Sequence, residues 1–306
     1  MNEVGRKITD KLIEIHRSAD FTIIFLPYKR SMWDSMESVY QECLASGAKA
    51  YCVPIPYYLM KHPKEAERVV SDRKLFDIGY DVSLLEEVKA DFVVIHYPYD
   101  HSNKVTSMLP EYHTAELRKY GNVVYIPYSC TNMRMLRVQP GIANVDYAFL
   151  KTEAEADAFV AEWKEYGVDF TGRAFGLGSP KMDAMNKCEH QADDIKTTVV
   201  INSLMPYLRD PFNKIEQYKG IILEELNAGH RVIFRPHPLL RQTIKSMRLD
   251  TQEKYNELLK WIIHSGGSID ESEFLESTLA QADILISDPS SVLEMWQSTG
   301  REYRVI

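Results

Sequence analysis

The chain has 306 residues, of which 45% are hydrophobic and 26% are charged. These proportions match soluble globular proteins, so they exclude disordered and fibrous classes, and the length allows about two domains. With 36 basic and 44 acidic residues the net charge is −8, which argues against a general nucleic-acid binder because such proteins carry a basic surface.

The first half of the chain alternates short β-rich runs with longer helical stretches. Strands are predicted over residues 21–26, 50–54, 91–97, 122–127 and 145–150. Helices are predicted over residues 31–46, 84–88, 111–120 and 153–166; the first has Met32, Met36, Val39, Tyr40 and Cys43 at helical spacing.

A second series of the same kind follows the polar stretch at residues 188–194, which is the predicted linker. Its strands are predicted over residues 197–201, 231–234 and 283–286, and its helices over residues 211–228 and 251–265. Regular alternation of this kind indicates an α/β fold with parallel sheets covered on both faces. We expect two Rossmann-like, doubly wound domains, at residues 1–187 and 188–306, with a ligand cleft between them at the carboxyl ends of the strands.

The cysteines and the first residues of the sequence indicate in which cellular compartment the protein is expected to function. The apolar runs are too short to span a bilayer, and the first six residues open a polar helix and not a signal peptide. The four cysteines are far apart and form no CxxC pair, which favours reduced, buried thiols: Cys43, Cys52, Cys130 and Cys188. We expect a cytoplasmic protein with no metal and no cofactor; peripheral association with the inner face of the membrane stays open.

The first candidate motif is Arg235-Pro236-His237-Pro238, where a buried strand ends in cationic side chains. The prolines disfavour helical geometry at Arg235 and His237, and an imidazole there can act as acid, base or hydrogen-bond donor to phosphate. A surface turn with an incidental histidine is the structural alternative. We take His237 and Arg235 as catalytic candidates.

The second motif is Ser287-Asp288-Pro289-Ser290-Ser291, which links an apolar strand to a helix. Ser290 or Ser291 is expected to cap that helix, and this alone explains a hydroxyl at the position. The same hydroxyls, free backbone N–H groups and the helix dipole also make an anion site. Asp288, Ser290, Ser291 and Glu294 are therefore candidates for binding a nucleotide donor, with Glu294 toward the ribose.

Two further stretches supply weaker candidates. Gly178-Ser179-Pro180-Lys181 allows a tight turn near a ligand, with Lys181 toward phosphate, although this stretch by itself favours a simple inter-domain turn. On the acceptor side, the loop after the first strand carries Lys29 and Arg30, which suit a phosphorylated acceptor. His96 ends the third strand in the same way.

The order of these motifs in the second half resembles the CDP-glycerol glycerophosphotransferases, the teichoic-acid primase and polymerase family with a GT-B fold. The resemblance covers residues 175–306. It matches the family's Gly-x-Pro-Arg-x-Asp turn at residues 178–183 with Lys181 for arginine, its basic-x-His-Pro strand end at residues 235–238, and its Ala-Asp-x-Leu-Ile-Ser-Asp-x-Ser-Ser-Val segment at residues 282–292.

The resemblance implies a transferase that moves glycerol phosphate, or a similar alditol phosphate, from a CDP-linked donor to an acceptor hydroxyl with release of CMP. Its setting would be cell-envelope or capsular polymer synthesis, with a polymer or lipid-linked acceptor. His237 and the Ser290/Ser291 cap would handle the donor, with Arg235 as a supporting charge.

Two departures from the family pattern leave alternatives open. The family's N-terminal Trp-His-Gly-Thr, whose histidine is the expected base, has no counterpart at Tyr128-Ser129-Cys130-Thr131, where Ser129 is the remaining acceptor-side candidate. The family also continues past the Ser-Ser helix with another strand and a closing helix, whereas this sequence ends at Ile306, so the second domain is expected to lack its last elements. The alternatives are another GT-B nucleotide-sugar glycosyltransferase, a UDP-sugar 2-epimerase, or a catalytically impaired nucleotide-binding relative. A further alternative is that the first half of the chain serves a different acceptor and has its own catalytic group.

Overall fold

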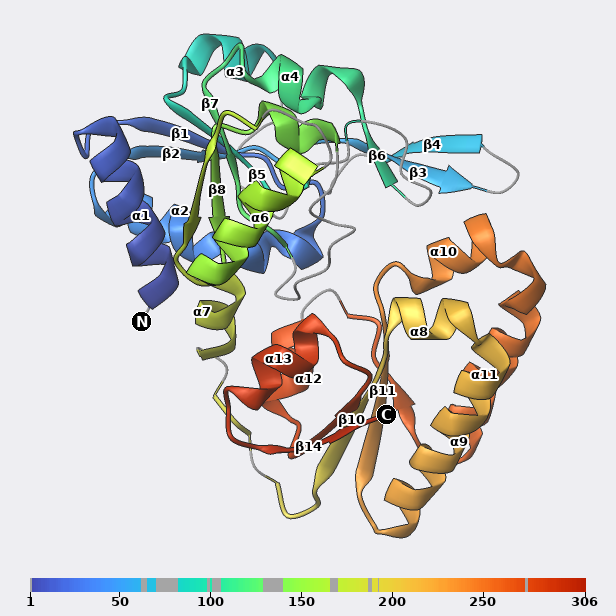
Figure 1. Cartoon of the computed structure of the whole chain (residues 1–306). Coiled ribbons are helices and arrows are strands. Elements are labelled where there is room, and N and C mark those ends of the chain that lie inside the picture. Colours follow the sequence, from blue (N-terminus) through green and yellow to red (C-terminus); the bar gives the residue numbers. More distant parts are fainter. Residues whose placement is uncertain are drawn as a thin grey trace. The chain divides into compact units, whose positions relative to one another are not determined.

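The computed structural model describes residues 2–61, 65–69, 82–97, 100, 106–128, 140–165, 170–186, 189–191, 193–272 and 275–306. The chain divides into two compact units, which are described separately below (Figure 1). The first consists of Met1–Leu59 with Ala66–Ala184, and the second of Met60–Glu65 with Met185–Ile306. The residues at the predicted domain boundary, 187 and 188, lie outside the described ranges.

The first unit is built on a parallel sheet with the strand order β2-β1-β5-β7-β8-β9. Its strands are β1 (Thr22–Phe25), β2 (Lys49–Cys52), β5 (Phe92–Ile95), β7 (Asn122–Tyr125), β8 (Tyr147–Leu150) and β9 (Arg173–Gly176). Strands β1, β5, β7 and β8 are almost entirely buried. This explains their continuous apolar runs, since a parallel strand covered on both faces has no solvent side.

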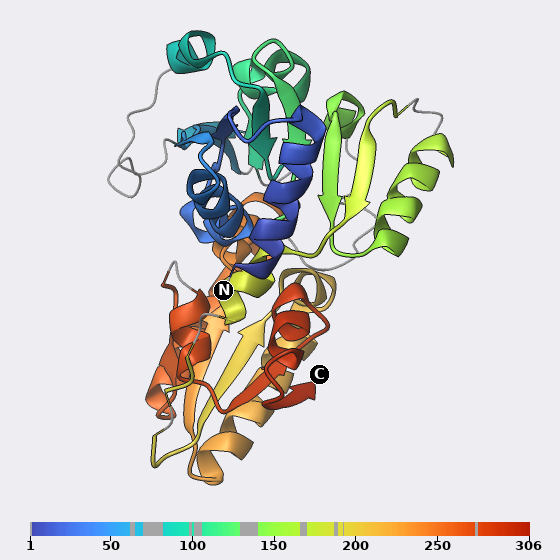
Figure 2. The ribbon, with the colours of Figure 1, turned by 90° about the vertical axis from the view of Figure 1, so that its left-hand side faces the viewer.

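Helices cover both faces of this sheet. One apolar cluster joins the sheet to α3 (Val82–Val88), α4 (Thr114–Leu117) and α6 (Glu153–Glu165). The other joins it to α1 (Glu3–His16) and α2 (Glu37–Ala45), and Figure 2 shows this side with α1 in front. The α1 and α2 helices pack closely, because a side chain at Gly5 would meet the backbone of Ser38 at 2.6 Å. The first unit is therefore doubly wound.

A small sheet with the order β4-β3-β6 was not expected from the sequence. It comprises β3 (Tyr57–Lys61), β4 (Glu65–Val69) and β6 (Thr106–Met108), and β3 pairs with β6 antiparallel. These strands are only three to five residues long and lack clear alternation, which is why pattern alone does not identify them.

The second unit has a parallel sheet in the order β12-β11-β10-β13-β14. The strands are β10 (Thr197–Asn202), β11 (Arg231–Pro236), β12 (Ser268–Ile269), β13 (Ile284–Ser287) and β14 (Glu302–Val305). On one face, α9 (Pro211–Asn227) and α11 (Gln252–His264) pack together against Val200, Phe234 and Ile286. Figure 1 shows α12 (Leu275–Ala280) and α13 (Ser291–Gln297) on the other side.

Remaining helical segments connect these elements. They are η1 (Arg30–Ser35), η3 (Pro110–Tyr112), η4 (Pro140–Asn144), α7 (Pro180–Asn186), α8 (Leu204–Arg209), α10 (Leu240–Met247) and η5 (Leu249–Thr251). No helix within the described ranges is long and apolar enough to cross a membrane.

The structure confirms the α/β class and every predicted strand, and it corrects two predicted helices. The helix predicted over residues 31–46 is split into η1 and α2, because Met36 leaves helical geometry at φ −130°. The helix predicted over residues 111–120 is split into η3 and α4 by His113, which is extended at ψ 144°. Cys43 and Cys52 are buried, as expected, whereas Cys130 and Cys188 lie outside the described residues.

Candidate functional site

The second unit has a topological switch point between β10 and β13. From β10 the chain adds β11 and β12 on one side of the sheet, and then β13 and β14 on the other. The loops that follow β10 and β13 therefore run in opposite directions from the switch point. Open α/β sheets bind ligands at such a point, just outside the carboxyl ends of the strands. The Ser-Asp-Pro-Ser-Ser motif lies at the end of β13, and the Arg-Pro-His-Pro motif lies at the end of β11, which pairs with β10.

His237 lies at this carboxyl edge and is half-buried. Its backbone N–H donates to the carbonyl of Asn202 at the end of β10, with an N···O distance of 3.0 Å. The backbone N–H of Leu239 donates to the ring Nδ1 at 3.1 Å. Because Nδ1 accepts, the neutral ring carries its proton on Nε2. The imidazole is thus set up as a hydrogen-bond donor through Nε2.

The hydroxyls after β13 divide their roles. Ser290 is the N-cap of α13, and its Oγ accepts from the backbone N–H of Leu293 at 3.2 Å. The same Oγ lies 3.1 Å from Oγ of Ser287, which is fully buried and bonds the carbonyl of Asp288. Ser291 is the first residue of the helix and is half-buried, as is Glu294. The cap interpretation of Ser290 is confirmed, and α13 is too short for its dipole to carry much of an anion site.

Asp288 is the centre of a buried polar network that the sequence did not predict. Its carboxylate pairs with the ammonium of Lys214 on α9, and both side chains are at least 87% buried since their exposures are 4% and 13%. The phenol of Tyr218 donates to Asn202 Oδ1 at 3.1 Å and reaches Asp288 Oδ2 at 3.5 Å. Burial raises the pKa of Tyr218, and the Asp288 charge raises it further, so the phenol stays a neutral donor. Asp288 thus holds Lys214 and is poorly suited to contact an anion directly.

The end of β10 carries two buried polar side chains. Asn202 is fully buried and its side chain interacts with the phenol of Tyr255, whereas Oγ of Ser203, a residue that is 6% exposed, has no hydrogen-bond partner among the described residues. A buried polar group without a partner is uncommon and calls for an explanation such as water or a ligand. The Ser203 hydroxyl and the Lys214 ammonium thus place two donors at the switch point.

Arg235 does not point its charge at this edge. Its guanidinium pairs with Asp270 and donates to Thr278 Oγ1 at 2.8 Å, to Ser272 Oγ at 3.1 Å and to the Ser272 carbonyl at 2.8 Å. The side chain is 5% exposed. These contacts favour a positioning role, in which Arg235 fixes the segment after β12 against the end of β11, and the catalytic role stays a prediction.

The first unit has its own switch point, between β1 and β5. His96 follows β5 there and is fully buried. Its Nε2 accepts from the backbone N–H of Tyr28 at 3.4 Å, and Nδ1 lies 3.2 Å from Oγ of Ser35. Burial lowers the pKa of His96 to about 3, so the ring is neutral. Both nitrogens are engaged inside the protein, which favours a structural histidine, and the acceptor-side role of His96 stays a prediction.

Lys29 follows β1 at the same edge and is half-buried. Its Nζ lies 5.3 Å from the centroid of the Tyr57 ring. Burial lowers the pKa of Lys29 to about 8. Arg30 begins η1, but the structure does not describe its side chain, and Ser129 lies outside the described residues.

The Gly178–Asp183 turn serves the first unit as a structural lock. Gly178 has φ +109°, and a Cβ there would meet Val4 at 2.9 Å. Asp183 is fully buried and accepts from the backbone N–H groups of Val4 and Gly5 at 3.1 and 2.8 Å, so it caps the start of α1. Lys181 pairs with Asp34 at 2.8 Å. This geometry accounts for the turn without a donor, and the donor-binding roles of Gly178 and Lys181 stay predictions.

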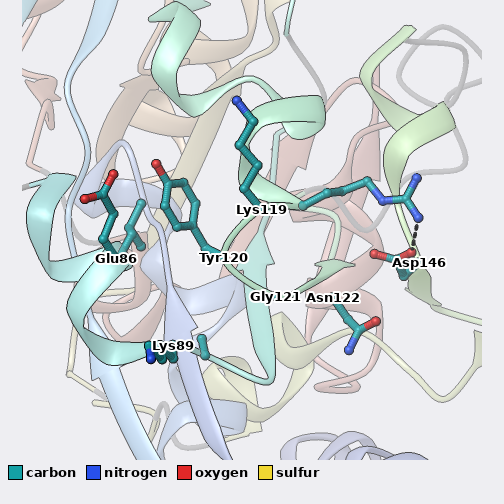
Figure 3. A pocket seen from close by; sticks show the side chains of 10 residues that line it. Glu86, Lys89, Lys119, Tyr120, Gly121, Asn122 and Asp146 are labelled. Atoms are coloured by element: carbon teal, nitrogen blue, oxygen red, sulfur yellow. Dashed lines mark hydrogen bonds and ion pairs between the residues drawn. The ribbon is translucent and has the colours of Figure 1, made fainter.

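A pocket of about 720 Å³ lies at the opposite, amino edge of the first sheet (Figure 3). It is lined by the ends of α3 and α4 and the starts of β7 and β8, including Lys89, Tyr120 and Asn122. The labelled side chains point in different directions around Gly121 (Figure 3). Its charges pair locally, as Arg118 does with Asp146 at 2.9 Å. We therefore place the candidate site at the carboxyl edges.

Long-range contacts explain why the sequence missed Lys214, Tyr218, Asn202 and Ser203. Lys214 and Asp288 are 74 residues apart. One local signal was available: Lys214 lies near the N-terminus of α9, where the helix dipole disfavours a cation unless a carboxylate compensates it. Within the described ranges, no group of three or more His, Cys, Asp or Glu side chains gathers as a metal site requires.

No protein-family model and no curated protein matches the sequence. Among solved structures, UDP-GlcNAc 2-epimerase from Neisseria meningitidis bound to UDP-GlcNAc aligns with a TM-score of 0.58 and 14% identity, over 93% of this chain and 82% of that one. The S. aureus MnaA–UDP structure aligns with a TM-score of 0.56 and 15% identity, over 93% and 79%. The fold is GT-B-like.

A structure of the wall teichoic acid polymerase TagF also aligns, with 12% identity over 98% of this chain and 78% of that one. Its TM-score of 0.45 is too low to support the fold or a function. The likeness to the first two structures establishes the fold alone, because both are below 25% identical.

Proposed function

We propose that the protein is an enzyme that transfers a group from a nucleoside-diphosphate-linked donor, and that the diphosphate binds at the carboxyl edge of the second sheet. The observation that carries this proposal is the collection of donors on either side of β10. His237 lies on the β11 side, the Ser290 and Ser291 hydroxyls lie on the β13 side, and Lys214 is held beside them by Asp288. Such a set suits the charge of a phosphate.

The donor class that fits the sequence motifs is a CDP-linked glycerol or similar alditol. In the reaction the acceptor oxygen attacks the phosphorus that bears the glycerol, and a new P–O bond forms. The P–O bond to CMP breaks, CMP leaves with the electron pair, and the acceptor proton passes to a base. His237 Nε2–H and Lys214 would bond the leaving phosphate oxygens, which gain charge in the transition state.

The acceptor is a hydroxyl on a polymer or lipid-linked chain, as cell-envelope polymer synthesis requires. We assign its binding to the carboxyl edge of the first sheet, where Lys29 and Arg30 follow β1. A cationic residue at this edge suits an acceptor that ends in phosphate.

A second candidate is a reaction on a UDP-sugar, either glycosyl transfer or 2-epimerisation. It is favoured by the alignment with two structures that hold UDP-GlcNAc or UDP. The donor set of the second unit suits this diphosphate equally well. The base of the nucleotide and the fate of the sugar separate the two candidates.

Titration calorimetry with CDP-glycerol, CDP-ribitol, UDP-GlcNAc, CMP and UMP tests the proposal directly. We expect CDP-glycerol to bind and CMP to compete for its site. Supplied with a poly(glycerol phosphate) acceptor, the protein should release CMP, which chromatography quantifies. Conversion of UDP-GlcNAc to its C2 epimer or release of UDP would support the second candidate. Failure of all five compounds to bind would overturn both.

A further inference from the structure

The proposed transfer requires a group that takes the proton of the acceptor hydroxyl. His96, the histidine at the carboxyl edge of the first sheet, is unsuited because its two ring nitrogens contact Tyr28 N–H and the Ser35 hydroxyl inside the core. Arg30 cannot serve, since a guanidinium does not lose its proton in proteins.

Lys29 differs from the lysines that form the ion pairs described above, because its ammonium lies over an aromatic ring instead of beside a carboxylate. The backbone at Lys29 is extended, and its carbonyl accepts from Met32 N–H at 3.1 Å, so the residue is fixed at the start of η1. Its ammonium lies over the Tyr57 ring, and among the described residues no carboxylate forms an ion pair with it.

The groups around Lys29 are mainly aromatic and neutral. Tyr57 comes from β3, and its ring lies 5.1 Å from Tyr28, which in turn lies 5.2 Å from His96. The Lys181–Asp34 pair acts on this cluster, because the Lys181 ammonium disfavours a positive charge at His96. A lysine that is half-buried among neutral rings loses hydration without gaining an opposing charge.

We propose that Lys29 is the general base of the transfer, which rests on the function proposed above. The neutral amine takes the proton as the acceptor O–H bond breaks and the new O–P bond forms. CMP departs with the electrons of the old P–O bond, and the resulting ammonium later releases its proton to water.

The acid–base properties of Lys29 support this role. Burial lowers the pKa of its ammonium to about 8, so about a tenth of the molecules hold a neutral amine at pH 7. An amine with a pKa near the working pH combines a sufficient neutral fraction with good basicity. The Tyr57 face stabilises the ammonium that forms after proton transfer.

Replacing Lys29 by arginine separates a base from a simple anion-binding group. Arginine keeps the charge and the donors but cannot accept a proton. We expect Lys29→Arg and Lys29→Met both to lower kcat/KM about 10²- to 10⁴-fold, as loss of a general base does. The wild-type pH profile of kcat/KM should rise with a midpoint near 8, and neither variant should show this limb. Methylamine should restore part of the activity of Lys29→Ala.

The matched control is Lys49, an exposed lysine on β2 of the same sheet, at 66% exposure. Lys49→Arg and Lys49→Met should leave kcat/KM unchanged. If Lys29→Arg stays within about tenfold of the wild type with an unchanged pH profile, Lys29 binds an anion and the base assignment is wrong.

A labelling experiment keeps this inference separate from the proposed function. Acetylation of Lys29 by acetic anhydride, followed by mass spectrometry from pH 6 to 11, should show a midpoint near 8 in the folded protein and near the ordinary lysine value of about 10.4 in urea. Equal midpoints would overturn the inference even if transfer occurs. Absence of any transfer with a Lys29 midpoint near 8 would instead refute the proposed function, and with it the role of Lys29 in this reaction.

Discussion

Each of the two parallel sheets has one switch point, but the side chains at their carboxyl edges differ in chemistry. In the first unit the edge between β1 and β5 holds tyrosine rings and the neutral His96. In the second unit the edge between β10 and β13 holds serines, an asparagine amide and the Lys214–Asp288 pair. Topology therefore sets where a ligand can bind, whereas the side chains at that edge decide which charge the ligand carries.

Within the described part of each unit a lysine–aspartate pair is largely shielded from solvent, and breaking these pairs is expected to have the largest effect. Lys214→Met leaves Asp288 buried without a counter-charge, and Lys181→Met does the same to Asp34. Each variant should lose about 3–5 kcal/mol of unfolding free energy, measured by urea denaturation. Only Lys214→Met should also weaken CDP binding, by at least about tenfold, because a hydrogen bond to a charged group contributes about 1.5–3 kcal/mol.

The CDP affinities of Asp288→Asn and Asp34→Asn, measured by titration calorimetry in the same series, provide a second comparison between the two pairs. Equal losses of CDP affinity in Lys214→Met and Lys181→Met would break the comparison, and would support donor binding by Lys181 as the sequence predicts.

The two edge histidines should differ in their effect on turnover. His237→Ala removes the Nε2–H donor and is expected to lower kcat about 10²- to 10³-fold with little change in donor affinity, since the bond strengthens in the transition state. Steady-state CMP release measures this. His264→Ala on α11, an exposed histidine of the same unit, is the control. Retention of more than a third of the turnover in His237→Ala would refute its catalytic role.

His96 should instead reveal itself in stability at acid pH. Its pKa is about 3 in the folded protein against 6.5 ordinarily, so between these values the unfolded chain takes up a proton that the folded chain does not. Stability is therefore lost as the pH falls through this window, by up to about 1.4 kcal/mol per pH unit from this group. His96→Gln should flatten this dependence in urea unfolding series from pH 7 to 4. Parallel wild-type and variant curves would contradict the burial of a neutral ring.

The smallest effects concern the serines after β13. Ser290→Ala removes the cap of α13 and should cost about 1 kcal/mol of stability, whereas Ser291→Ala should cost little. If the hydroxyls also bind the donor, the double variant should lower CDP affinity about tenfold. A loss of stability without any change in affinity would assign Ser290 to capping alone.

Much of the fold was predictable because burial on both faces leaves a strong local trace. Runs such as residues 92–95 and 284–286 are apolar throughout, and periodicity identifies α9 to within a residue at each end. The short strands β3, β4 and β6 leave no such trace, and neither does the break at Met36.

The candidate site was predictable only where its residues adjoin a strand end. His237 and Ser290 follow buried strands directly, so the sequence shows them. Lys214 pairs with Asp288, 74 residues away in the sequence, and Arg235 pairs with Asp270, 35 residues away. Only the folded structure therefore shows that Lys214 belongs to the Asp288 network and that Arg235 is held by Asp270 instead.

Because Asp183 caps α1, the first helix of the chain depends on a residue that is synthesised much later. The backbone N–H groups of Val4 and Gly5 meet their acceptor 178 or more residues later, from a carboxylate that is itself fully buried. As the ribosome delivers the chain, the opening helix can form early but cannot be secured at its beginning until the turn at Gly178 has emerged. Folding of the first unit thus ends when its last segment, which carries Asp183, binds the start of its first helix.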